Sequence, residues 1–347
     1  MTKRRVGVFG ANGHTGRFVA AELKRRGLGA RWIGRDSDAL SELQTTLKHG
    51  EMCVASIEDF GSLLRAFDGL DAVINCAGPF LDTSRAVIAA ALAAGCHYLD
   101  VTAEQVTVLD IISTFDGPAK AAGRVVLPAM AFYGGLADLI ATSIVDEWID
   151  VDAIDIAVAL NSWHPTFGTR RTGERNTATR LLVREGTLSA VPSPALTSRW
   201  RFPEPFGSQV VTCVPFSEII LLSRHVKAAA ITSYMTLKPL ADLSNEATPP
   251  PRGSDASGRS DQVFAMSVRA KRSAEIREAT VTGRDIYAVT APLVVEAYVR
   301  LLDGASPSWA GVRSPGEIFH ASTFLAALTD VLTPQRISSP FSLERNL

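Results

Sequence analysis

Three glycines at three-residue spacing, Gly10, Gly13 and Gly16, constrain the fold of this chain more than any other feature. A short apolar run at residues 6–9 precedes them, an amphipathic helical pattern follows, and a second short strand is expected at residues 31–33. This order of strand, glycine-rich turn, helix and strand is typical of a dinucleotide-binding domain. A glycine-rich turn without a ligand is the alternative, but the elements in register favour nucleotide binding.

Each glycine has its own expected role in this turn. Gly10 permits a tight turn after the strand, Gly13 lets the backbone approach a pyrophosphate, and Gly16 lets the helix lie close to the strand. Free N–H groups and the positive end of the helix dipole then face the phosphates. At His14 we expect the backbone to matter and the side chain not to. The cofactor-binding residues expected here are Gly10, Asn12, Gly13, His14, Thr15 and Gly16.

The remainder of the chain divides into two kinds of pattern. Strand and helix patterns alternate as far as residue 128, which predicts a parallel sheet with helices on both faces. Beyond it, residues 152–160 alternate as a half-buried strand, and residues 263–270 and 276–282 predict a hairpin. The predicted fold class is α/β, with an N-terminal Rossmann domain built on a doubly wound parallel sheet and a second α+β domain. The expected bounds are 1–130 for the Rossmann domain, 131–315 for the α+β domain that contacts substrate or a second subunit, and 316–347 for a C-terminal segment whose helix, at 318–332, packs back on the first domain.

Composition and charge exclude several classes of protein. A net charge of −1 provides no overall basic surface for nucleic acid. The four cysteines are far apart and form no C-x-x-C motif, so we expect no metal site, no disulfide framework and a cytoplasmic location. No apolar run reaches the ~18 residues of a membrane span. The expected partner is a small-molecule substrate, with no nucleic acid and no membrane, and homodimerisation stays open.

Arg35 and Asp36 stand at the end of the second strand, about 20 residues beyond the glycines, where the adenosine ribose is recognised. An arginine there suits the 2′-phosphate of NADP through a bidentate contact, whereas an aspartate suits the 2′-hydroxyl of NAD. We favour NADP over NAD, and Asp36 keeps the choice open.

Further candidates follow the later strands of the first half. Ligands sit at the carboxyl ends of strands in doubly wound sheets, where Asn75, Ala77, Gly78 and Pro79 are expected to contact the cofactor. Asp100 could orient a substrate or the nicotinamide amide, although capping of the next helix is an equal alternative. Four side chains are candidates for catalysis by proton transfer or substrate orientation: Tyr133, Glu104, Asp100 and His164. For Tyr133 the alternative is an aromatic wall, and for His164 an incidental histidine.

Several segments together resemble the saccharopine dehydrogenase-like oxidoreductases: GANGHTGRFVAAEL, WIGRD, DAVINCAGPF, GCHYLDVTAE, AFYGGLADLIA and GVRSPGEIF. The resemblance covers most of the first domain and one C-terminal motif, and little of residues 160–260. It implies a Rossmann domain that binds NADP, a mixed-sheet second domain, and chemistry at the cleft between them. Tyr133-Gly134-Gly135-Leu136 departs from the family's usual segment, so saccharopine chemistry itself is not carried over.

We therefore predict that the protein is an NADP-dependent oxidoreductase. It would transfer a hydride between the nicotinamide and a small carbonyl, imine or activated alkene. Two alternatives remain open: a non-catalytic NADP-binding sensor or assembly protein, and a redox-neutral enzyme that uses bound NADP.

Overall fold

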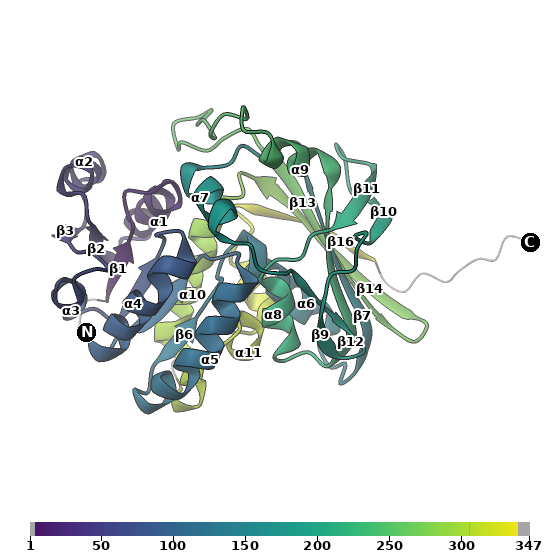
Figure 1. The fold of residues 1–347 in the computed structure, drawn as a ribbon, viewed down its shortest axis with the longest axis horizontal. Helices are drawn as coiled ribbons and strands as arrows, with labels where there is room; N and C mark the ends of the chain where they lie inside the picture. The colour runs from purple at the N-terminus through teal and green to yellow at the C-terminus, as the bar shows by residue number, and fades with distance from the viewer. Residues whose placement is uncertain (1–3, 305, 339–347) are drawn as a thin grey trace, which may run out of the picture.

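Two β-sheets organise the chain, in a computed structural model that describes residues 4–304 and 306–338 (Figure 1). The last nine residues of the expected C-terminal segment lie outside the described residues. The first sheet is parallel throughout, in the order β15-β6-β5-β4-β1-β2-β3. Its strands are β1 (Arg5–Phe9), β2 (Gly29–Gly34), β3 (Glu51–Val54), β4 (Ala72–Asn75), β5 (His97–Asp100), β6 (Val125–Leu127) and β15 (Gly311–Val312).

Helices cover both faces of the first sheet, because its strands are apolar on both sides. In β4, Ala72 and Ile74 belong to one core cluster and Val73 to the other. The first cluster also contains side chains of α1 (His14–Arg25), α2 (Ser37–Leu47) and α10 (Thr290–Gly304). The second contains side chains of α3 (Phe60–Phe67), α4 (Phe80–Ala93) and α5 (Gln105–Ala121). The predicted doubly wound α/β domain is therefore confirmed.

The second sheet is mixed and runs in the order β10-β11-β12-β7-β13-β14-β16, with β8 on β12 and β9 on β8. Both strand predictions are confirmed: Ile154, Ile156, Val158 and Leu160 are buried, and a hairpin turns at Ser273. The strands are β7 (Val151–Leu160), β8 (Leu181–Arg184), β9 (Thr187–Ala190), β10 (Thr197–Arg201), β11 (Ser208–Cys213), β12 (Ala228–Thr236), β13 (Val263–Arg272), β14 (Glu275–Arg284) and β16 (Leu332–Ser338).

The core of the second sheet is continuous with that of the first, because α6 and α10 contribute to the same cluster as β1 and β7. The remaining helical elements are η1 (Phe132–Leu136), α6 (Ala137–Val145), α7 (Phe167–Arg175), α8 (Glu218–Ser223), α9 (Leu237–Ser244), η2 (Pro307–Trp309), α11 (Pro315–Ile318) and α12 (Ala321–Ala326). None of the helices in the described part of the chain is long and apolar enough to cross a membrane.

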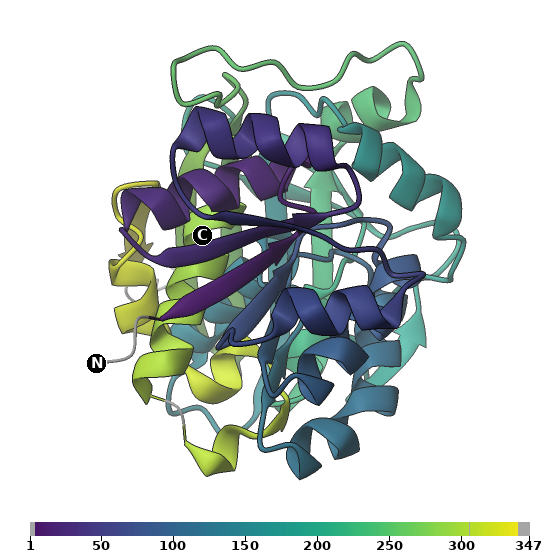
Figure 2. The same cartoon turned by 90° about the vertical axis from the view of Figure 1, so that its left-hand side faces the viewer.

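The end of the chain differs from the sequence-based expectation. In place of one helix over residues 318–332, the short helices α11 and α12 are followed by β16, which pairs with β14 of the second sheet. The chain is extended at Phe319 and His320, where His320 caps α12 by accepting a hydrogen bond from Thr323 N, and α12 ends at Ala326. The helix α10 returns to the first domain, where it packs against α1 (Figure 2).

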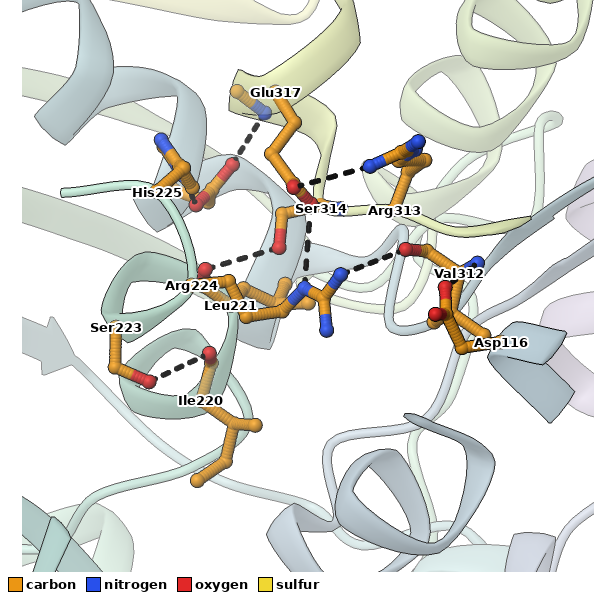
Figure 3. A network of polar contacts seen from close by, with 12 residues as sticks. Asp116, Ile220, Leu221, Ser223, Arg224, His225, Val312, Arg313, Ser314 and Glu317 are labelled. Atoms are coloured by element: carbon orange, nitrogen blue, oxygen red, sulfur yellow. Dashed lines mark hydrogen bonds and ion pairs between the residues drawn. The ribbon is translucent and has the colours of Figure 1, made fainter. Parts of the chain in front are cut away.

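Residues 311–319 connect the two halves of the molecule (Figure 3). Asp116 of α5 accepts a hydrogen bond from Val312 N at 3.0 Å, and Arg224 Nη2 donates to the carbonyl of Val312 at 2.8 Å. Ser314 Oγ donates to the carbonyl of Leu221 at 2.9 Å. The strand β15 is therefore held at the sheet edge from both sides.

A buried ion pair lies beneath this segment. Asp138 of α6 is fully buried, and its carboxylate lies 2.7 Å from His225 Nε2 and accepts a hydrogen bond from Gly316 N at 2.6 Å. Burial works against the charged ring, but the charge and hydrogen bond of Asp138 outweigh it and raise the pKa of His225. A histidine whose folded-state pKa is raised stabilises the fold below its unfolded pKa and loses this effect as the pH rises through the folded value.

We therefore expect the free energy of unfolding to fall as the pH rises above about 6.5, the ordinary pKa of histidine, measured by urea denaturation. In His225→Gln the amide can still donate to Asp138 but does not titrate, so this part of the pH dependence should disappear. An unchanged pH dependence in the variant would exclude His225 as its source.

Candidate functional site

The glycine turn forms the base of a phosphate site. Gly10 has φ 78°, and a Cβ placed there would lie 2.8 Å from the Cβ of Ala77. A Cβ on Gly16 would collide with the carbonyl oxygen of Gly10. Gly13 caps α1 without a side-chain hydrogen bond, so no side chain occupies the N–H groups of the first turn. A pyrophosphate fits this arrangement, because both the close backbone approach and the free N–H groups are present.

Other predicted residues of the turn lie beside it. The carbonyl of Asn12 accepts a hydrogen bond from Arg17 Nε at 3.0 Å, and its Oδ1 faces Gly34 at the end of β2. Thr15 lies in the first turn of α1. Arg17, which the sequence analysis did not single out, thus brings a positive charge to the same turn.

The structure separates the roles of Arg35 and Asp36. Asp36 is the N-cap of α2, and its Oδ1 accepts hydrogen bonds from Asp38 N at 3.1 Å and Ala39 N at 3.0 Å. Arg35 is exposed at the carboxyl end of β2. The aspartate therefore has a local structural function, whereas no hydrogen bond or ion pair ties the exposed side chain of Arg35 to the rest of the described chain.

A buried chain of hydrogen bonds connects the ends of β4, β5 and β6. Asn75 Nδ2 donates to Tyr98 OH at 3.2 Å, and Tyr98 OH donates to Asp100 Oδ2 at 2.9 Å. Asp100 Oδ1 accepts from Ala129 N at 2.8 Å and Thr102 N at 3.0 Å. Asn75 Oδ1 accepts from Ala77 N at 2.9 Å, which fixes the start of the loop that also contains Gly78 and Pro79. Asn75 and Asp100 thus shape the site from beneath and do not line it.

Asp100 and Glu104 are acids in unusual surroundings. Burial raises the pKa of Asp100 to about 6, although its backbone and Tyr98 hydrogen bonds lower it. Burial also raises the pKa of Glu104, whose hydrogen bonds from Thr107 Oγ1 at 2.6 Å and from Phe80 N at 3.3 Å lower it. Glu104 therefore holds the first turn of α4 against α5.

We expect Asp100→Asn to lower the free energy of unfolding by about 1–3 kcal/mol, because the amide nitrogen in the place of Oδ2 cannot accept the hydrogen bond of Tyr98 OH. Urea denaturation monitored by circular dichroism measures it. Asp110→Asn, in the exposed ion pair with Arg85, is the matched control and should cost at most about 1 kcal/mol. Equal losses in both variants would contradict a special role for Asp100.

Tyr133 lies in an aromatic stack at the junction of the two sheets. Its ring is stacked on Phe216, with centroids 4.3 Å apart, and on Trp163 at 5.4 Å. Its hydroxyl is buried and has no hydrogen-bond partner among the residues that the structure describes, and burial raises the pKa of Tyr133 well above its usual value. A buried hydroxyl without a partner is costly in free energy. A ligand atom that accepts a hydrogen bond from this hydroxyl would remove that cost.

In the described part of the chain, no hydrogen bond or ring contact joins His164 to Tyr133, Glu104 or Asp100. Its Nδ1 lies 3.2 Å from the carbonyl oxygen of Pro249, and the residue lines a pocket of about 320 Å³ with residues 249–252, Ser162, residues 260–262 and Tyr287.

Tyr287 lines the same pocket as His164 and also contacts the glycine turn. Its ring meets the ring of His14 edge-on at 5.2 Å, and its hydroxyl lies 3.0 Å from both Trp163 Nε1 and Thr169 Oγ1. The sequence analysis missed Tyr287, Trp163 and Phe216. Two of them could have been found from their positions after predicted strands. Trp163 follows β7 and Tyr287 follows β14, and both strands run antiparallel to β13, so they end at the same end of the sheet.

Comparison with known proteins agrees with this geometry. A family model described as NAD(P)H-binding matches residues 10–109. The chain superimposes on apo histidine-tagged saccharopine dehydrogenase (L-Glu forming) from Saccharomyces cerevisiae with a TM-score of 0.65 and 14% identity, over 96% of this chain and 99% of that one. A short-chain type dehydrogenase/reductase from Mycobacterium ulcerans aligns with 36% of this chain and 66% of its own at 18% identity, with a TM-score of 0.32. No curated protein matches the chain.

The family model covers the glycine turn and the strands β2 to β5. The match to saccharopine dehydrogenase covers 96% of this chain and so includes both sheets. The resemblance expected from the sequence motifs is thus confirmed in the fold: the chain has the saccharopine dehydrogenase fold, and its first domain is of the NAD(P)H-binding type.

Proposed function

We propose that the protein is an NADP-dependent oxidoreductase that transfers a hydride between the nicotinamide and a small carbonyl, imine or activated alkene. The observation that carries the cofactor choice is the capping of α2 by Asp36, which commits one oxygen of that carboxylate to the helix while Arg35 is exposed at the end of β2. A guanidinium there suits a 2′-phosphate.

The chain's own residues have three tasks in such a reaction. The glycine turn, with Gly10, Gly13 and Gly16, binds the pyrophosphate, and Ala77, Gly78 and Pro79 border the dinucleotide at the end of β4. Bound NADP would supply or accept the hydride. The aromatic stack around Tyr133 excludes water. The Tyr133 hydroxyl, which its raised pKa keeps protonated, donates a proton to the oxygen or nitrogen of the substrate as it is reduced and regains one from solvent when the product leaves.

The cofactor preference is tested by titration with NADPH and NADH, followed by fluorescence or thermal stabilisation. We expect Arg35→Gln to weaken NADPH binding about tenfold, by loss of a charge-assisted contact, and to leave NADH binding unchanged. Lys24→Gln removes the same charge from the far end of α1 and should alter neither affinity. Equal weakening for both cofactors would argue against a 2′-phosphate contact, and failure of the wild type to bind either would refute the proposal.

The role of Tyr133 is tested with Tyr133→Phe. The free energy of unfolding and the affinity for NADPH should stay unchanged, because the hydroxyl makes no hydrogen bond within the described chain that the variant would lose. The rate of NADPH oxidation at 340 nm, measured on the substrate found by screening carbonyl, imine and alkene compounds, should fall about 10²- to 10⁴-fold. A full rate in the variant would assign the proton to another donor. A wild type that binds NADPH but turns over nothing in the screen would favour the non-catalytic or redox-neutral alternatives.

A further inference from the structure

The helix α7 lies between the two sheets, above their junction (Figure 1). It leaves the second domain after β7 and reaches the first domain near α4. Not one of its nine residues is buried, and Phe167 at its start is 75% exposed. A helix with so little buried apolar surface is held in place by polar contacts, and such segments open at low cost in free energy.

Two contacts attach α7 to the first domain. The Oγ1 of Thr172 lies 3.5 Å from the position that a Cβ would take on Gly78. The guanidinium of Arg175 forms an ion pair with Asp82, in the first turn of α4, at 2.5 Å. Gly78 follows β4, and β1 and β4 are the neighbouring strands at which the order of the parallel sheet reverses. Ligands of doubly wound sheets lie in the crevice at that point, so α7 lies directly over it.

Hydrogen bonds attach α7 to its own domain. Thr169 Oγ1 lies 3.0 Å from the hydroxyl of Tyr287, whose ring touches His14 of the glycine turn. Arg170 Nη2 donates to the carbonyl of Thr248 at 2.7 Å. The helix therefore contacts both sides of the dinucleotide crevice while it buries no side chain of its own.

We propose that α7 completes the dinucleotide site from the second domain, with the Thr172 hydroxyl as a ligand of the bound cofactor and the Arg175–Asp82 ion pair holding the helix closed. The proposal rests on the proposed cofactor. A dinucleotide reaches Gly78 when the ion pair opens, and it leaves the crevice by the same route.

The ligand role is tested with Thr172→Val, which keeps the shape of the side chain and removes its hydroxyl. We expect the dissociation constant for NADPH to rise about three- to tenfold, and Thr172→Ser to restore it. Thr46→Val, on the exposed side of α2, is the control and should bind as the wild type does. An unchanged dissociation constant in Thr172→Val would overturn the ligand role.

The closing role is tested by charge reversal. Arg175→Asp and Asp82→Arg each place like charges opposite one another, so both variants should bind and release NADPH about two- to fivefold faster in stopped-flow fluorescence. The double variant recreates an ion pair in the opposite sense and should return both rates to the wild-type values. Lys227→Asp, in the exposed pair with Asp150, is the matched control. Unchanged rates in both single variants would overturn the closing role.

Hydrogen exchange separates failure of this proposal from failure of the proposed function. The α7 amides should exchange faster in Arg175→Asp than in the wild type without any nucleotide, whether or not the protein binds NADP. In the wild type, saturating NADPH should slow the exchange of α7. If NADPH binds and the α7 amides exchange as before, the helix does not cover the dinucleotide and the proposal fails.

Discussion

The carboxylate of Asp100 is the interaction on which the geometry of the site depends. It accepts hydrogen bonds from the backbone beyond β6, from the loop that precedes α5 and from Tyr98 on its own strand. Through Tyr98 and Asn75 the same chain of contacts reaches the loop at the end of β4, which contacts the glycine turn. Three neighbouring strand ends are therefore fixed relative to one another from below. A ligand at this sheet edge meets a surface whose shape is set before it binds.

The acidic residues of the site stabilise the backbone around it. Asp100, Glu104 and Asp36 each accept hydrogen bonds from backbone N–H groups at strand or helix ends. The groups left over for a ligand are of a different kind: exposed Arg35, the Arg17 side chain beside Asn12, and the hydroxyl of Tyr133. The site therefore offers positive charge at the phosphate end and a neutral proton donor within an aromatic wall at the other.

Local sequence patterns predicted the parts of the structure that depend on interactions between residues close together in the chain. The glycine turn, the alternation of β7 and the hairpin at Ser273 all follow from spacing and turn chemistry, and all were found. What the sequence could not reveal was which side chains distant residues would bring together. The pairing of Tyr133 with Trp163 and Phe216, and of His14 with Tyr287, depends on how the second sheet sits on the first. The end of the chain was misread for a similar reason, because pairing with β14 outweighs the helical spacing before β16.

The strand β15 carries a consequence for how the protein is made. It is the edge strand of the first sheet and pairs with β6, although nearly two hundred residues separate the two strands in the chain. The helix α10, which covers α1, is also synthesised late. During translation from the N-terminus, the nucleotide-binding half therefore emerges with an unpaired sheet edge and an uncovered apolar helix face. Exposed edges and apolar faces invite aggregation. The open sheet edge and the apolar face of α1 are therefore covered only after the last third of the chain has been synthesised. Until then, a chaperone is what can keep them from aggregating.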